Sequence, residues 1–188
     1  MPEWLLLDYG QVLCTAPPAD EWDELRRAAG YHDPDDFHRT YWKHRPPYDR
    51  GDVTAADFWA TVAPETRRER LMELDVRIWL HPHLPSVAAM RAAGERGWRL
   101  ALFSNAPVEV ADAIDALEWL EPVERRFYSC RIGWVKPEPD AYRRVLDGLK
   151  AEPANVVFFD DRPDNVAAAR AAGMIAHVFT DAAQIEAV

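Results

Sequence analysis

The sequence predicts an α/β protein: a Rossmann-like parallel sheet flanked by helices, with a small all-helical domain inserted after the first strand. The first observation is a set of short apolar runs that end in polar or turn-forming residues. These runs are 3–8 (EWLLLD), 98–103 (WRLALF), 125–130 (RRFYSC), 155–159 (NVVFF) and 175–179 (IAHVF). The second observation is that helical patterns of about 10–13 residues lie between the later runs. Strands that alternate with helices through short loops form a parallel sheet with both faces covered.

The third observation is that residues 17–82 carry helical patterns and no strand pattern. The helical patterns in this segment are 17–30, 33–45, 54–64 and 65–80. We therefore expect an all-helical insertion over 17–82 and an α/β core made of 1–16 and 83–188.

Cap and turn residues mark the ends of the expected helices in the insertion. Gly30 follows the arginines that end the first helix, and Asp33 and Pro34 begin the second. The second helix is expected to stop before Pro46 and Pro47, because proline lacks the amide hydrogen that a helix interior needs.

Similar signals mark the helices that follow. Thr54 and Asp57 have the spacing of a capping box at the start of the third helix. In the core, Ser86 is the expected N-cap of a helix that ends at Gly97. The core helices are expected at 85–97, 139–150 and 161–173.

Length, charge and cysteine content narrow the class of protein. The chain has 188 residues, 48% of them hydrophobic, which is enough for one packed core with a small satellite domain. The net charge of −10 makes nucleic acid and membrane surfaces poor partners. Cys14 and Cys130 fit no paired spacing, and no basic, apolar leader follows Met1, so we expect a cytoplasmic protein with reduced thiols. The sequence leaves the oligomeric state open.

Polar residues cluster after the expected strands, at the edge where parallel sheets bind ligands. They are Asp8, Ser104, Asn105, Lys136, Asp160 and Asp161. Each alone has an ordinary explanation as a turn, cap or surface residue. Together they provide a carboxylate that can attack, a hydroxyl and an ammonium that can hold an anion, and carboxylates for a hard cation such as Mg²⁺. The set indicates phosphoryl transfer to a carboxylate, followed by hydrolysis of the acyl phosphate.

Four segments carry a resemblance to a known family. In order they are LLLDYGQVL (5–13), LALFSNA (100–106), GWVKPEPDAY (133–142) and VVFFDDRPDN (156–165). In these motifs the chain resembles the haloacid dehalogenase-like (HAD) hydrolases, and the helical insertion resembles the cap of their phosphatase-rich branch. The resemblance covers essentially the whole chain. It implies a Mg²⁺-dependent phosphatase that acts on a small phosphorylated metabolite, with sugar phosphates among the candidates.

The resemblance also implies roles for the motif residues. Asp8 is the expected nucleophile that becomes phosphorylated. Ser104, with backbone N–H groups near Asn105, is expected to hold the transferring phosphoryl group. Lys136 is expected to pair with both the nucleophile and the phosphate.

A metal site is implied by the same motifs. Asp8, the backbone carbonyl of Gly10 and the carboxylate of Asp161 are the expected protein ligands of Mg²⁺. Asp160 is expected to support the ion from a second layer or through water.

One position departs from the family pattern. Most phosphatases of the family carry Asp two residues after the nucleophile, where this chain has Gly10, followed by Gln11. General acid–base help of the kind that Asp gives is typically worth about 10²–10⁴-fold in rate. A related phosphatase branch also has glycine here, so a phosphatase is expected to favour leaving groups that need little protonation. A water molecule, Gln11 or a cap residue would then replace the missing Asp as the general acid and base.

Two alternatives stay open at this point. A dehalogenase-type hydrolase also lacks the second Asp and needs no metal, but the intact Asp160–Asp161 pair argues against it. A weakly active binding module is the other alternative, and the presence of Asp8, Lys136 and Asp161 argues against that.

The insertion carries a basic and aromatic segment over residues 38–50. We expect Trp42, His44, Arg45 and Tyr48 to line a lid over the phosphate site. The alternative is a solvated helix face with an ordinary core stripe.

Overall fold

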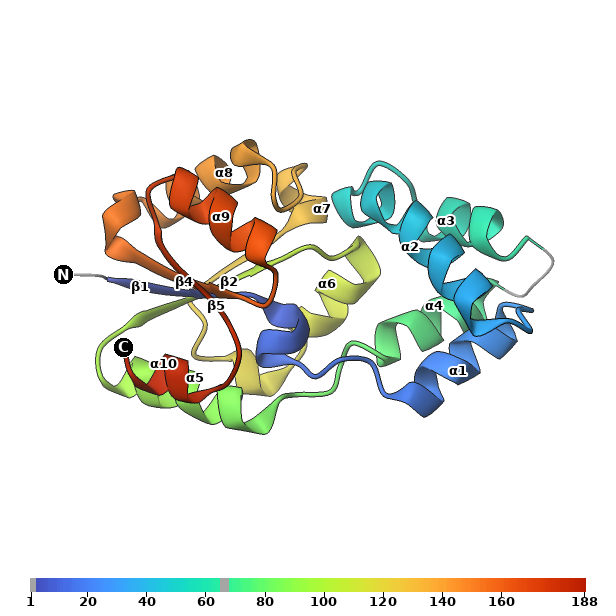
Figure 1. The fold of residues 1–188 in the computed structure, drawn as a ribbon, viewed down its shortest axis with the longest axis horizontal. Coiled ribbons are helices and arrows are strands. Elements are labelled where there is room, and N and C mark those ends of the chain that lie inside the picture. The colour runs from blue at the N-terminus through green and yellow to red at the C-terminus, as the bar shows by residue number, and fades with distance from the viewer. Residues whose placement is uncertain (1–2, 65–67) are drawn as a thin grey trace.

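The computed structural model of the chain describes residues 3–64 and 68–188. It confirms the predicted class, because five parallel strands form one sheet in the order β3-β2-β1-β4-β5 with helices on both faces (Figure 1). The strands are β1 (Trp4–Leu7), β2 (Arg99–Ser104), β3 (Arg125–Tyr128), β4 (Val156–Asp160) and β5 (Ile175–Val178). Each lies within or next to an apolar run predicted from the sequence.

The helices of the α/β core cover the two faces of the sheet. On one face lie α5 (Leu84–Glu95), α6 (Val108–Asp115) and α10 (Ala183–Glu186). On the other lie α8 (Pro139–Leu149) and α9 (Pro163–Ala171). The short elements are η1 (Tyr9–Leu13), η2 (Glu118–Leu120), α7 (Ser129–Ile132) and η3 (Pro153–Asn155).

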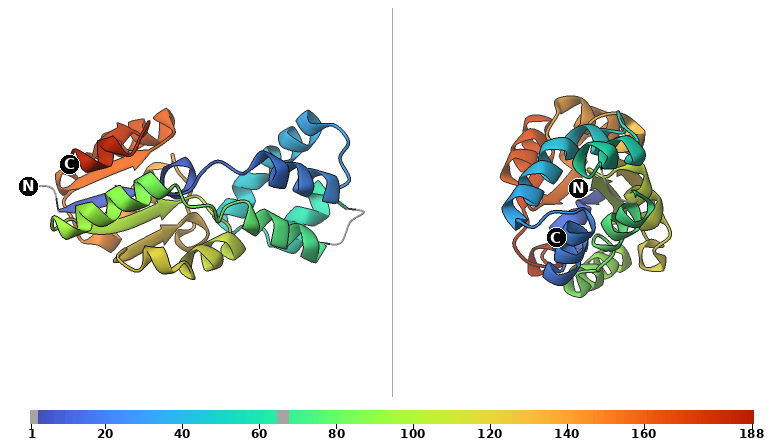
Figure 2. Two further views of the ribbon diagram at one scale, coloured as in Figure 1. Left: turned by 90° about the horizontal axis from the view of Figure 1, so that it is seen from below. Right: turned by 90° about the vertical axis from the view of Figure 1, so that its right-hand side faces the viewer.

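Residues between η1 and α5 form four α-helices and no strand in the described part of this segment. They are α1 (Ala19–Ala28), α2 (Pro34–Arg50), α3 (Ala55–Val62) and α4 (Arg68–Arg77). These helices pack around an apolar cluster of their own, which includes Phe37, Trp59 and Leu74. They lie beyond one end of the sheet, on the opposite side from the C-terminus (Figures 1 and 2). The start of the fourth predicted helix, residues 65–67, lies outside the described residues.

The predicted end of the second helix was wrong. Helix α2 continues through Pro46 and Pro47 and ends at Arg50, where Gly51 adopts a left-handed conformation with φ of 86°. A proline in a helix interior costs about 3 kcal/mol. Tyr48, beyond the prolines, is 2% exposed and stacks on an aromatic ring of α3, so burial of this last turn offsets the cost.

The predicted Thr54 cap is confirmed, and the predicted Ser86 cap was wrong. The Thr54 hydroxyl accepts a hydrogen bond from the Asp57 amide at 3.2 Å and caps α3 as expected. Ser86 does not cap α5: His83 is the N-cap residue, and the Ser86 hydroxyl lies 2.7 Å from His83 Nδ1. Gly97, with φ of 98°, follows the end of this helix as predicted.

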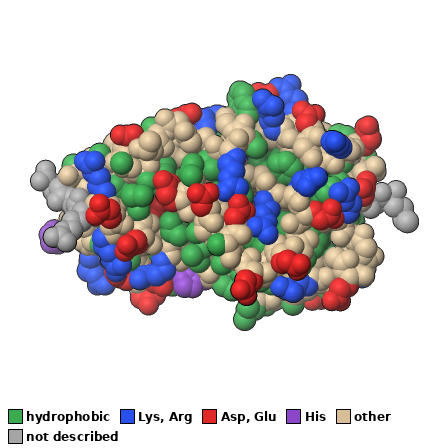
Figure 3. Space-filling view, turned by 180° about the vertical axis from the view of Figure 1, so that it is seen from behind, with side chains coloured by type: hydrophobic (Ala, Val, Ile, Leu, Met, Phe, Trp, Pro, Cys, Tyr) green, Lys and Arg blue, Asp and Glu red, His purple; other side chains and the backbone are tan. Residues whose placement is uncertain are grey.

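The surface carries charges of both signs. On the face shown in Figure 3, acidic and basic side chains are interspersed and do not gather into one basic area. Cys14 and Cys130 are both unpaired. None of the helices in the described part of the chain has the length and apolar character needed to cross a lipid bilayer.

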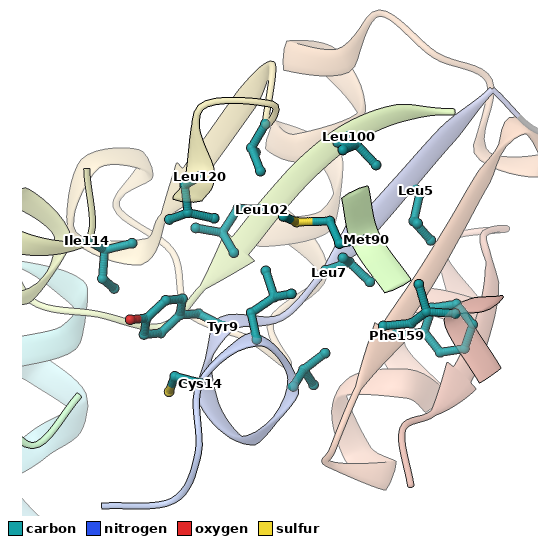
Figure 4. Packing of buried hydrophobic residues seen from close by; sticks show 14 of the residues in the cluster. Leu5, Leu7, Tyr9, Cys14, Met90, Leu100, Leu102, Ile114, Leu120 and Phe159 are labelled. Carbon is teal, nitrogen blue, oxygen red and sulfur yellow. The ribbon is translucent and has the colours of Figure 1, made fainter. Parts of the chain in front are cut away.

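The centre of the sheet is fully buried and fixes the edge where the site forms. In β1, Leu5 and Leu7 point to one face and pack with residues such as Met90 (Figure 4), while Leu6 points to the other face. Leu7 is paired in parallel register with β2 on one side and with Phe159 of β4 on the other. The carboxyl ends of these three strands therefore meet at one edge of the sheet.

Candidate active site

Three carboxylates meet at this edge. Asp8 follows β1, Asp160 ends β4 and Asp161 follows β4, so the parallel register brings them together. A carboxylate oxygen of each lies within 4.8 Å of the others. Asp8 and Asp160 are buried and Asp161 is half-buried. The sequence predicts the same three residues at one metal site, and the structure brings them together.

A buried ammonium group lies against the carboxylates. Lys136 Nζ is 2.7 Å from Asp8 Oδ1 and 2.6 Å from Asp160 Oδ2, and it donates a hydrogen bond to the carbonyl of Phe103 at 2.9 Å. Burial alone would lower the pKa of Lys136, but the Asp160 and Asp8 carboxylates raise it above its ordinary value. Burial raises the pKa of Asp8 to about 7, although Lys136 opposes that shift. One cation does not compensate three acids.

The two acids at the end of β4 have different surroundings. Asp160 accepts hydrogen bonds from the Asn165 side chain and the Arg162 amide, each at 2.9 Å to Oδ1, so its carboxylate is held from within the protein. Asp161 faces the cavity and accepts a hydrogen bond from Gln11 Nε2 at 3.1 Å. Burial and the neighbouring Asp160 raise the pKa of Asp161. A cation that enters the cavity thus meets Asp161 before Asp160.

The loop after β2 forms a second wall of the site. Ser104 is 4% exposed and lines the same cavity as Asp8. The Asn105 side chain donates to the Lys136 carbonyl at 2.9 Å and accepts from the Lys136 amide at 2.8 Å. These two hydrogen bonds fix the loop that bears Ser104 against the segment that bears Lys136.

Gly10 is not required by the backbone. Its φ of −63° and ψ of 125° are open to any residue, and a Cβ added there would meet nothing within 4 Å. Gln11, the next residue, has a positive φ of 57°. The departure from the family pattern is therefore a change in chemistry and is not forced by lack of space.

A cavity of about 480 Å³ lies between these residues and helix α2. Of the lid residues expected from the sequence, Trp42 and Arg45 line it. His44 and Tyr48 are not among the described lining residues, and the Tyr48 hydroxyl instead donates to Glu109 Oε2 at 2.9 Å.

The cavity is also lined by residues that the sequence did not predict, and three of them come from the helical insertion. They are His38, Asp49 and Trp79. The spacing of 38, 42, 45 and 49 would have found the first two, since it follows one face of a helix. For Asp49 that signal was lost because the second helix was expected to stop before Pro46.

The chain matches a family of hydrolases and resembles several characterised proteins over part of their length. The model of the family described as haloacid dehalogenase-like hydrolase matches residues 16–173, a range that begins after Asp8. Bifunctional epoxide hydrolase 2 of Rattus norvegicus is 35% identical over 104 residues, which is 53% of this chain and 19% of that protein. Phosphatase MT3486 of Mycobacterium tuberculosis is 28% identical over 130 residues, which is 65% of this chain and 60% of that protein. The chain therefore spans less than two thirds of the length of these relatives.

Solved structures share the fold. A HAD family enzyme of Bacteroides thetaiotaomicron, bt-2542, in complex with magnesium and inorganic phosphate, has a TM-score of 0.78 at 16% identity, with 96% of each chain covered. The L-2-haloacid dehalogenase RSc1362 has a TM-score of 0.73 at 13% identity, with 93% of this chain and 85% of that chain covered. At these identities the likeness concerns the fold and leaves the reaction open.

Proposed function

Because the chain belongs to the haloacid dehalogenase-like hydrolase family, we propose that it is a Mg²⁺-dependent phosphatase. It would act through an aspartyl-phosphate on a small phosphorylated metabolite, with sugar phosphates as candidate substrates. The observation that carries the proposal is the cluster of Asp8, Asp160 and Asp161 around one buried ammonium group. The similarity to a mycobacterial phosphatase supports the same reaction class.

The residues at the site fit a divalent cation. Carboxylates about 4 Å apart repel by about 4 kcal/mol per pair at an intermediate dielectric, and Mg²⁺ relieves this repulsion. Asp8, the carbonyl of Gly10 and Asp161 would hold the ion, while Asp160, which also pairs with Lys136, would support it from a second layer or through water. When bound, Mg²⁺ would supply positive charge to the oxygens of the transferring phosphoryl group.

The protein's own groups would divide the remaining work. Asp8 attacks phosphorus and becomes the acyl phosphate. Lys136 holds Asp8 in position and pairs with the incoming phosphate. The Ser104 hydroxyl, with backbone N–H groups near Asn105, receives the phosphoryl oxygens. In this proposal residues 17–82 act as a cap that closes the cavity over the core of 1–16 and 83–188.

The two other readings of the sequence find less support. A dehalogenase of the kind found among the structural relatives displaces an anionic halide, and two further carboxylates beside Asp8 would oppose that step. A binding module would have no need of the buried Asp8–Lys136 ion pair, since burial of such groups carries a desolvation cost.

The test is a phosphatase screen over sugar phosphates, nucleotides and aryl phosphates, with Mg²⁺ and with a chelator. We expect Mg²⁺-dependent phosphate release that the Asp8→Asn variant loses. Asp20→Asn, an exposed acid in the first turn of α1, is the matched control and keeps the activity. Phosphate release that ignores both the metal and the Asp8→Asn change would refute the proposal.

A further inference from the structure

One face of helix α2 lies against the cavity. His38, Trp42, Arg45 and Asp49 follow one another at helical spacing, and all four line the cavity that contains Asp8. Asp49 is the carboxylate of this set and comes from the turn of the helix beyond the two prolines.

The described residues that line the cavity include three carboxylates: Asp8, Asp49 and Asp161. In the proposed function Asp8 and Asp161 both hold the metal, and Asp8 is also the nucleophile. Neither can carry the proton that the leaving group needs. Gly10 has no side chain to supply one, so Asp49 is the carboxyl group left for that task.

Hydrogen bonds tie Asp49 to the loop that would hold the phosphoryl group. The Ser129 hydroxyl donates to the backbone carbonyl of Asp49 and accepts from the Ala106 amide at 2.9 Å. Ala106 directly follows Ser104 and Asn105. The Asp49 backbone is thus linked to that loop through Ser129 by two hydrogen bonds. This link places the end of α2 beside the expected phosphate position.

The residues on either side of Asp49 are also fixed to the core. The Tyr48 hydroxyl donates to Glu109 of α6, and the Arg50 guanidinium donates to Glu138 at 2.7 Å, two residues after Lys136. Asp49 is therefore held between two contacts that join α2 to the α/β core. A group positioned in this way can act on a bound substrate with little loss of conformational entropy.

The Asp49 carboxylate has an environment suited to proton transfer. Oδ1 accepts a hydrogen bond from Arg45 Nε at 2.6 Å, and Oδ2 has no hydrogen-bond partner among residues 3–64 and 68–188. Burial raises the pKa of Asp49 to about 6, with Arg45 opposing the shift and Asp75 of α4 adding to it. Burial raises the pKa of the Cys130 thiol of α7 to about 11, and the charge of Asp49 adds to that shift. A carboxyl group with the pKa of Asp49 exchanges protons readily near neutral pH.

We propose that Asp49 is the general acid and base of the reaction, in the role that an Asp at position 10 would otherwise fill. The proposal rests on the proposed function. In the first step an Asp8 oxygen bonds to phosphorus, the ester P–O bond breaks, and the leaving oxygen takes the Asp49 proton. In the second step water bonds to phosphorus, Asp49 takes its proton, and the P–O bond to Asp8 breaks. Ester and water become alcohol and phosphate, and both residues return to their starting states.

The test compares two esters that differ in their need for an acid. The first-turnover release of the leaving group is measured with Mg²⁺ for the phosphate of a simple primary alcohol and for para-nitrophenyl phosphate. Asp49→Asn is expected to slow the alkyl ester by about 10²- to 10⁴-fold and the aryl ester by less than about 10-fold, since nitrophenolate leaves without a proton. Asp49→Glu, which keeps a carboxyl group, should recover part of the alkyl rate.

Asp75→Asn is the matched control, because Asp75 also pairs with Arg45 but does not line the cavity. A variant that loses activity only because its structure is disturbed should release the leaving group of both esters more slowly by the same factor, and we expect this of Asp75→Asn. Wild-type protein gives a second measurement that needs no variant: the alkyl rate should fall as the pH rises above about 6, and the aryl first-turnover rate should not.

The outcomes separate the two proposals. If the wild type shows Mg²⁺- and Asp8-dependent activity but Asp49→Asn affects both esters equally or neither, the role of Asp49 is refuted and the proposed function stands. If the wild type releases phosphate from neither ester, both proposals fall. Circular dichroism of each variant identifies a loss that comes from unfolding, and in that case the wild-type pH profiles decide.

Discussion

Replacement of Lys136 by Met tests the charge balance of the site. The Lys136 side chain is buried and pairs with Asp8 and Asp160 at 2.7 and 2.6 Å. Met keeps the length and apolar stem of the lysine and removes its charge. The variant therefore leaves three clustered carboxylates, Asp161 included, without the buried ammonium group.

The structure allows the size of the effect to be worked out. Removal of one partner of a buried ion pair costs about 3–5 kcal/mol. Asp160 keeps its hydrogen bonds from Asn165 and Arg162, and Asp8 can take up a proton at neutral pH because its pKa is already about 7. We therefore expect a loss near the lower limit, about 3 kcal/mol, which for a chain of this length lowers Tm by roughly 6–12 °C.

The assay is thermal unfolding without metal and with excess Mg²⁺. A bound divalent cation replaces the missing charge, so Mg²⁺ should raise the Tm of Lys136→Met more than that of the wild type. Lys43→Met, at an exposed position on α2, is the control and should change stability by less than about 0.5 kcal/mol. A Lys136→Met variant as stable as the wild type, or one to which Mg²⁺ gives no extra stabilisation, would refute the charge balance described here.

Two further predictions concern the missing and the proposed acid. Gly10→Asp should fold normally, because a Cβ there meets nothing within 4 Å. Added to Asp49→Asn, it should raise the rate on the alkyl phosphate at least about 10-fold above that of Asp49→Asn alone. Steady-state assays of the double variant measure this rate, and an unchanged rate would contradict the prediction. The Asp49 pKa of about 6 in the folded protein exceeds its ordinary value of 3.8, so this group favours the folded state at low pH and that contribution is lost as the pH rises to about 6. The free energy of unfolding of Asp49→Asn, measured with urea, should therefore increase relative to that of the wild type by up to about 3 kcal/mol between pH 4 and pH 7. A difference between the two proteins that does not change with pH would count against a raised Asp49 pKa.

The sheet and the cluster of acids at its carboxyl end were predictable, because the apolar runs of the strands agree with the burial that a central parallel sheet requires. The apolar run of β1 is buried on both faces, and a central parallel strand needs that pattern. Once the strands are known, the rule that their carboxyl ends meet places Asp8 beside Asp160 without further information. Spacing along the chain had no part in this result, since these residues are far apart in the sequence.

The cap face of the cavity was less predictable, because there local rules compete with packing. Pro46 and Pro47 are strong helix-ending signals, yet tertiary contacts of Tyr48 and Arg50 continue the helix through them. Asp49 was missed as a consequence: it follows the predicted end of the helix, whereas in the structure it lies in α2 and lines the cavity. A bond such as that between Ser129 and the Asp49 carbonyl joins segments whose pairing no local pattern encodes.

Carboxylates in one cavity can take different roles when their surroundings differ. Asp8, Asp160 and Asp161 with Lys136 carry two net negative charges when ionised, which a divalent cation would balance while it lowers the pKa of Asp8 and keeps that group ionised for attack. Among residues 3–64 and 68–188, Asp49 has Arg45 as its one cationic partner, and Arg45 is shared with Asp75. A metal at the sheet edge would thus ionise the nucleophile and leave the carboxyl group on α2 able to hold a proton. Because Gly10 has no side chain, position 10 places no fourth carboxyl group beside the metal ligands. The proton for the leaving group would therefore come from the opposite wall of the cavity, where Asp49 lies.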